Sequence, residues 1–242
     1  MTKELVIRGS LMIKKYDWFF ENLQNKVNFC YVRFNDGEMM GIERLGAVAA
    51  RGDQIVNSSL KAALTDAIKH RQSNYYVGIP CSICYPHLNR LAKEIVGDYK
   101  LTTSAVLLTN RNWKYFYDNF SKSMTSRKML WVGGKDQDPE KLKDYGLNIE
   151  KTIRVHNKDS WSFYEDLKNV IPKYVKDDYV VGISLGPTAR VLCRRLFEEF
   201  PNVTFLDMGS LLDPVTKGKY FDAHKGWEQT GFNYVRRCKE CN

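Results

Sequence analysis

The sequence predicts an α/β fold in which one mostly parallel sheet is covered by helices on both faces. Short apolar runs alternate along the whole chain with segments of helical periodicity, and several of these runs end in glycine, proline or aspartate. A length of 242 residues, with 43% hydrophobic and 27% charged residues, is typical of one large globular domain. We therefore expect a single domain over residues 1–242.

The elements follow in order along the chain. Residues 10–27 should form an N-terminal helix, because their apolar side chains recur on one helical face. Strands are expected at residues 28–34, 75–79, 105–109, 129–132, 152–155, 179–185 and 203–206. Further helices are expected at residues 58–71 (capped by Ser58 or Ser59), 86–96, 111–122, 159–170 and 188–197. The tail, residues 208–242, is expected to be irregular.

Composition and charge exclude several classes of protein. No apolar run reaches the ~20 residues that a membrane-spanning helix needs, and the first residues lack the apolar stretch of a signal peptide. The sequence therefore predicts a cytoplasmic protein without a transmembrane segment. The net charge of +9 is spread over the chain rather than gathered in one basic tract, so we expect no nucleic-acid partner.

The end of the first expected strand carries the clearest chemical signal. The apolar run stops abruptly at Asp36-Gly37-Glu38, where Gly37 allows a tight turn. On an extended or turning backbone, Asp36 and Glu38 would project to roughly one side. Carboxylates gathered at the end of a strand suit a hard divalent cation such as Mg²⁺ or Mn²⁺. The alternative is a solvated turn, since these are ordinary loop residues.

A second signal lies where the strand expected at residues 179–185 meets its helix. Gly186 and Pro187 lead into that helix, and Pro187 suits its first position. Free backbone N–H groups there can hold an anion, with the Thr188 hydroxyl as a further donor. The alternative is a plain strand-to-helix turn. The segment matches neither a dinucleotide fingerprint nor a Walker P-loop.

A third carboxylate, Asp207, ends the last expected strand and should face the same edge of the sheet as Asp36. It could serve as a metal ligand, a partner of a sugar hydroxyl or a general base. Asp213 is the alternative for the catalytic role, or a residue of a simple Asp-Pro turn.

The chain carries two Cys-x-x-Cys pairs, at Cys81 and Cys84 and at Cys238 and Cys241. Each pair is a standard half-site for tetrahedral thiolate coordination. We expect the four thiolates to converge on one structural zinc ion that holds the C-terminal tail to the domain. Unpaired thiols or a redox disulfide are the alternatives.

These motifs together resemble the GT-D type glycosyltransferases. The resemblance rests on residues 33–38, 78–80, 185–189 and 206–210, which appear in that family's order, and it spans roughly residues 28–215, most of the chain. Two positions depart from the family pattern. Asn35 stands where the family often has glycine, and Ser210 stands where many members have histidine.

The resemblance implies a Rossmann-like sheet that binds a nucleotide sugar, usually a uridine diphosphate (UDP) sugar, with Mn²⁺ or Mg²⁺. It assigns Asp36 and Glu38 to the metal and the diphosphate. Arg33 and Arg111 are candidate cationic partners of the donor, together with Phe34 and the helix start at Gly186, Pro187 and Thr188. The acceptor would be a glycan, a glycoprotein or a small molecule, and inverting and retaining outcomes both stay open.

Two other classes of function compete with this one. Another Rossmann-like enzyme, such as an S-adenosylmethionine-dependent methyltransferase or a metal-dependent phosphohydrolase, would share the fold. A non-catalytic nucleic-acid-binding module would explain the positive charge. Metal-dependent stabilisation by UDP favours a transferase over the binding module, and stabilisation by S-adenosylmethionine without metal favours a methyltransferase.

Overall fold

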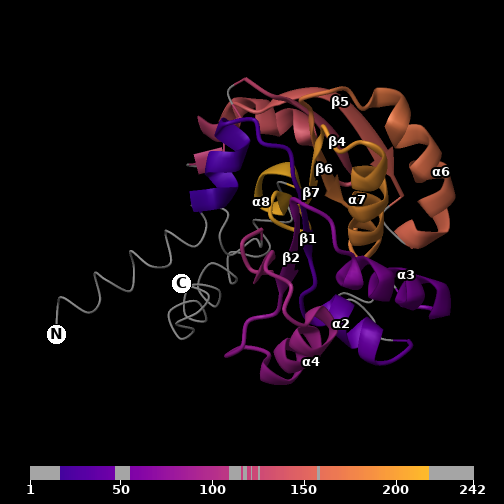
Figure 1. The fold of residues 1–242 in the computed structure, drawn as a ribbon. Helices are drawn as coiled ribbons and strands as arrows, with labels where there is room; N and C mark the ends of the chain where they lie inside the picture. Colours follow the sequence, from indigo (N-terminus) through magenta and orange to yellow (C-terminus); the bar gives the residue numbers. More distant parts are fainter. Residues whose placement is uncertain are drawn as a thin grey trace.

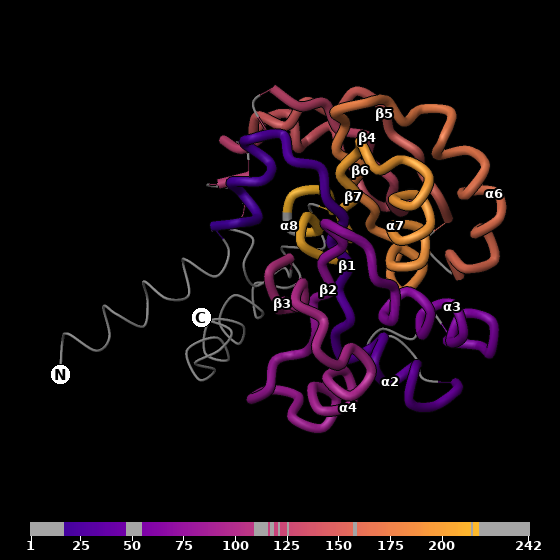
Figure 2. The backbone as a smooth tube through the Cα atoms, viewed as in Figure 1, coloured from indigo at the N-terminus to yellow at the C-terminus, as the bar shows by residue number. Residues whose placement is uncertain are grey.

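The computed structural model describes residues 17–46, 55–108, 116, 119–120, 122–124, 126–156 and 159–217. In these ranges seven strands form one parallel sheet in the order β3-β2-β1-β7-β6-β4-β5 (Figures 1 and 2). The strands are β1 (Cys30–Arg33), β2 (Tyr75–Ile79), β3 (Thr102–Ser104), β4 (Lys128–Gly134), β5 (Asn148–Val155), β6 (Val180–Ser184) and β7 (Thr204–Asp207). The predicted α/β fold is therefore confirmed.

Helices cover both faces of this sheet. The α-helices are α2 (Asp36–Glu43), α3 (Ser58–Lys69), α4 (Pro86–Val96), α6 (Tyr164–Val170), α7 (Thr188–Glu199) and α8 (Asp213–Thr216). The 3₁₀ helices are η2 (Pro139–Tyr145), η3 (Ser160–Phe163) and η4 (Ile171–Tyr174), and residues 17–24 are also helical. In Figure 1 the indigo helix of residues 17–24 and α8 lie on the side of the sheet opposite α7.

The two faces carry separate hydrophobic cores, and the strands divide their side chains between them. In β1, Val32 packs with α3, α4 and α7, whereas Tyr31 packs with the helix of residues 17–24. In β7, Phe205 and Leu206 divide in the same way. This alternation, with nearly continuous burial along each strand, is what a parallel sheet covered on both faces requires.

The strand order places β1 beside β7 in the middle of the sheet. β1 continues through α2 and α3 to β2 on one side, while β7 and β6 lie on its other side. The loops after β1, β6 and β7 therefore start next to one another at the carboxyl edge of the sheet. That edge is where open α/β sheets bind their ligands.

Several predicted elements are wrong in detail. The strand expected at residues 105–109 is absent. Residues 105–108 form turns after β3. Leu107 and Leu108 are apolar because they pack in the hydrophobic core that contains Tyr31. Asn57, rather than Ser58 or Ser59, caps α3, because its side-chain oxygen accepts the Leu60 N–H at 2.9 Å.

The ends of the chain differ in part from expectation. The N-terminal helix ends at Gln24 rather than at residue 27, and its expected first residues lie outside the described ranges. The tail predicted to be irregular from residue 208 contains the short helix α8, and residues from 218 onward lie outside the described ranges. No helix in the described part of the chain is long and apolar enough to cross a membrane.

Candidate functional site

The first predicted site segment is helical rather than extended. Asn35 caps α2, which begins at Asp36, and the Asn35 N–H donates to Glu38 Oε2 at 3.0 Å. Successive helical residues turn by about 100°, so residues two apart point to nearly opposite sides. The expectation that Asp36 and Glu38 project together is therefore wrong. Asn35 has a negative φ of −97°, which does not require the glycine common in the resembling family.

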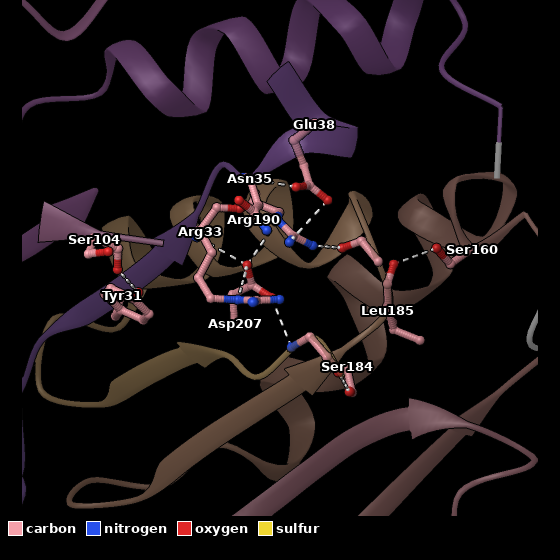
Figure 3. Close-up of polar contacts among 12 residues, drawn as sticks. Tyr31, Arg33, Asn35, Glu38, Ser104, Ser160, Ser184, Leu185, Arg190 and Asp207 are labelled. Carbon is pink, nitrogen blue, oxygen red and sulfur yellow. Dashed lines mark hydrogen bonds and ion pairs between the residues drawn. The ribbon is translucent and has the colours of Figure 1, made fainter. Parts of the chain in front are cut away.

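Glu38 is buried and already paired. Its Oε1 lies 3.1 Å from Arg190 Nη2, while its Oε2 accepts the Asn35 N–H (Figure 3). Each oxygen of the Glu38 carboxylate thus has one partner within the protein. The Asp36 side chain is different, because it is half-buried and makes no hydrogen bond or ion pair with any described residue.

Asp207 ends β7 and lies at the centre of a buried cluster of charges. It is 0% exposed, and its Oδ2 accepts the Arg33 N–H at 3.1 Å and lies 2.9 Å from Arg190 Nε. Its Oδ1 accepts the Gly209 N–H at 3.2 Å. Burial raises the pKa of the Asp207 carboxyl above its ordinary value, and Arg190 and Arg33 oppose this rise. Both oxygens are thus engaged with the protein, which suits a residue that positions arginines.

Arg190, on the first turn of α7, joins the three neighbouring strand ends. Besides its carboxylate partners, its Nε donates to the Arg33 carbonyl at 2.7 Å and its Nη1 donates to the Gly186 carbonyl. The side chain is 3% exposed. We did not predict this residue as part of the site. The sequence feature that could have indicated it is an arginine flanked by the apolar residues Ala189 and Val191 near the start of a helix.

The Gly186-Pro187-Thr188 segment lies at the predicted strand-to-helix junction. Gly186 has a φ of +54°, a conformation that favours glycine, and α7 begins at Thr188. Thr188 is 0% exposed, and its hydroxyl lies 2.8 Å from Ser160 Oγ, so the expected hydroxyl donor faces the protein interior. The Thr188 N–H has no acceptor among the described residues and leaves one amide donor at the helix start.

Asp213 belongs to a second polar cluster, which the sequence did not reveal as a unit. Its Oδ1 accepts from Gln137 Nε2 at 2.9 Å, and its Oδ2 lies 3.3 Å from Lys217 Nζ. Burial lowers the pKa of Lys217, but Asp213 and Asp136 outweigh burial, so the pKa is raised overall. Gln137 Nε2 also lies 3.3 Å from Ser184 Oγ. The cluster therefore ties α8 to the ends of β4 and β6.

The structure describes some of the remaining predicted site residues and not others. Phe34 is 0% exposed and packs in the core that includes α3 and α7, and its expected role in donor binding stays a prediction. Arg111 lies outside the described residues, as do Cys238 and Cys241. Cys81 and Cys84 share one turn, in which the Cys84 N–H donates to Cys81 Sγ at 3.4 Å.

The described residues contain no ready-made metal centre. In these ranges no group of three or more histidine, cysteine, aspartate or glutamate side chains is arranged to hold an ion. One pocket of about 570 Å³ opens along α3 and Leu45, but none of the predicted site residues lines it. The chemistry at the carboxyl edge therefore rests on Arg33, Asp36, Glu38, Arg190 and Asp207.

Comparison with known proteins agrees with this architecture. Residues 16–215 match the family model described as a GT-D fold-like domain. A solved structure titled "The highly conserved domain of unknown function 1792 has a distinct glycosyltransferase fold" superposes with a TM-score of 0.65 at 15% identity, covering 85% of this chain and 79% of that one. A selenomethionine-substituted structure of the same domain gives the same values. No curated protein matches the sequence.

Proposed function

The chain belongs to the GT-D fold-like family, and from this premise we propose that it is a glycosyltransferase that uses a nucleotide sugar, most simply a UDP sugar. The observation that carries the proposal is the carboxyl edge of the sheet. There a buried cluster of two arginines and two carboxylates lies at the end of β1, where Asp36 begins α2 and its carboxylate makes no hydrogen bond or ion pair with a described residue. This edge can receive a diphosphate, and the family has a glycosyltransferase fold.

A divalent cation fits this site as a companion of the diphosphate. Mg²⁺ is usually held by one or two carboxylates together with substrate phosphates and waters. Asp36 supplies one such carboxylate, and no cluster of three ligands is then needed within the described residues. Bound there, Mn²⁺ or Mg²⁺ would neutralise charge on the leaving diphosphate. Glu38 instead serves to hold Arg190 and the first turn of α2.

The remaining roles follow from the contacts. Asp207 positions Arg33 and Arg190, because its oxygens are used within the protein. Asp213 also has partners, Gln137 and Lys217, but it is 8% exposed whereas Asp207 is 0% exposed, so it is the candidate for orienting an acceptor hydroxyl or accepting its proton. The Thr188 amide adds an anion donor at the start of α7. The partners are then a nucleotide-sugar donor and a glycan, glycoprotein or small-molecule acceptor.

A screen of nucleotide sugars with Mn²⁺ tests the proposal. We expect at least one donor to release its nucleoside diphosphate slowly in the absence of acceptor, because water can replace the acceptor hydroxyl. Release should stop when a chelator is added. If no donor is hydrolysed or bound, while S-adenosylmethionine stabilises the protein without metal, the transferase assignment is wrong and a methyltransferase is favoured.

We also propose a structural zinc ion bound by Cys81, Cys84, Cys238 and Cys241. The turn that carries Cys81 and Cys84 supports half of this site, because the Cys84 N–H already donates to Cys81 Sγ. Protein purified without chelator is expected to contain about one equivalent of zinc, and Cys81→Ser should remove it. Cys30→Ser is the control, since Cys30 belongs to neither pair and is buried in the core. Less than about half an equivalent of zinc, with all four thiols titratable in the native protein, contradicts the site.

A further inference from the structure

The Arg33 side chain ends in an unusual environment for a buried cation. Only 6% of the side chain is exposed, and Figure 3 shows it running from β1 past Asp207 toward Ser184. Its guanidinium lies against Gly209, which has a φ of +48°. A Cβ atom at position 209 would overlap Arg33 Nη2. The guanidinium can therefore occupy this place only because residue 209 is glycine.

The guanidinium of Arg33 donates no hydrogen bond to the part of the chain that the structure describes. Arg33 Nε is buried without a hydrogen-bond partner, and neither terminal nitrogen donates to any described residue. Its nearest carboxylate oxygen is Asp207 Oδ2, 3.5 Å from Nε. A buried donor without an acceptor costs free energy, and more so when it is charged. An anion that accepts hydrogen bonds from the Arg33 guanidinium would therefore offset this cost.

The charge of Arg33 is also the less well neutralised of the two arginines. Arg190 lies 2.9 Å from Asp207 Oδ2 and 3.1 Å from Glu38 Oε1, so it draws on both buried carboxylates. Arg33 shares only Asp207, at the longer distance. Asp207 therefore fixes where Arg33 lies, while the guanidinium donates no hydrogen bond to the described residues. A planar guanidinium with free N–H groups is suited to bidentate binding of phosphate oxygens.

We propose that Arg33 forms an anion subsite that binds the donor's diphosphate even without a metal ion, with Asp207 and Gly209 as its positioning residues. The inference deepens the proposed function, on which it rests for the identity of the anion. It separates two contributions to diphosphate binding at this edge of the sheet. Arg33 supplies direct hydrogen bonds to the diphosphate, whereas the ion at Asp36 supplies the metal-dependent part.

Inorganic pyrophosphate in the presence of a chelator is the direct probe. Calorimetry should show that Arg33→Gln binds pyrophosphate about tenfold or more weakly than the unmodified protein, as expected for losing hydrogen bonds from a charged group. Arg33→Lys keeps the charge but loses the planar pair of donors, so it should fall between the two. Arg154→Gln is the matched control, because it removes one charge from an exposed side chain.

Gly209→Ala tests the positioning without touching any charge. Its new Cβ should displace the guanidinium and weaken pyrophosphate binding by a similar factor. Gly97→Ala is its control, because Gly97 also has a positive φ of +59° but a Cβ there meets no atom within 4 Å. Circular dichroism and thermal unfolding of each variant establish that the proteins compared are folded.

The outcomes separate the inference from the proposed function. Unchanged pyrophosphate affinity in folded Arg33→Gln, or no metal-free binding by the unmodified protein, overturns the subsite. UDP affinity should fall by the same factor as pyrophosphate affinity, and uridine affinity should not change. If only pyrophosphate binding falls, the assignment to the donor is wrong. An Arg33-dependent pyrophosphate site in a protein that hydrolyses no nucleotide sugar supports the subsite and contradicts the transferase.

Discussion

Arg190→Met is expected to lower the free energy of unfolding by about 3–5 kcal/mol, the usual loss when one partner of a buried ion pair is removed. The substitution leaves Asp207 and Glu38 buried without their shared cation. It also removes the donors to the carbonyls of Arg33 and Gly186, which hold α7 against the end of β1. Methionine fills much of the same volume and is a good helix former, so the loss reports the polar contacts.

Urea denaturation of Arg190→Met and Arg195→Met measures this effect with a matched control. Arg195 lies on the same helix, but its side chain is 47% exposed and its ion pair with Glu198 spans 3.8 Å. Such surface pairs contribute about 0–1 kcal/mol, so Arg195→Met should unfold nearly as the unmodified protein does. Equal losses of unfolding free energy in the two variants would show that the buried charge cluster does not stabilise the packing of α7 against these strand ends.

The strands were predictable because parallel strands buried on both faces are continuous apolar runs. β2 was predicted with its observed bounds, and β4 and β6 were predicted close to theirs. The same rule produced the error at residues 105–109. Leu107 and Leu108 are apolar because a turn carries them into the core, and a short apolar run does not distinguish a buried strand from a buried turn.

The local structure of the site was misread at α2 for a reason visible in the sequence. Asn35 followed three residues later by Glu38 is a capping pattern, and it starts a helix where we expected an extended turn. Gly37 drew attention to a turn that does not form. The correction matters for function, because the helix turns Glu38 toward Arg190, while the Asp36 carboxylate makes no hydrogen bond or ion pair with a described residue.

The buried charge cluster could not be predicted from the sequence, although its members could be seen there. Arg33 and Asp207 are separated along the chain and meet only because β1 pairs with β7. The sequence places both at strand ends and on the same edge of the sheet. It does not show that Asp207 is fully buried or that Arg190 reaches it from α7, because both facts depend on strand order.

Asp36→Asn is expected to remove most of the metal-dependent part of nucleotide binding while leaving the fold intact. Asparagine keeps the size of the side chain but lacks the charge that a divalent ion requires. Because the Asp36 side chain makes no hydrogen bond or ion pair with a described residue, stability should change mainly by the loss of a favourable charge at the start of α2, about 0.3–1 kcal/mol. Asp166→Asn, at an exposed position in the first turn of α6, is the matched control.

The most direct measurement is the affinity for UDP with Mn²⁺ and with chelator, compared between the unmodified protein, Asp36→Asn and Asp166→Asn. We predict that Mn²⁺ strengthens UDP binding in the unmodified protein and in Asp166→Asn. In Asp36→Asn this gain should fall by about 100-fold or more, beyond the usual effect of residues that only support metal ligands. If Asp36→Asn keeps the full gain from Mn²⁺, then Asp36 does not hold the ion, and the proposed donor site at this edge of the sheet is contradicted.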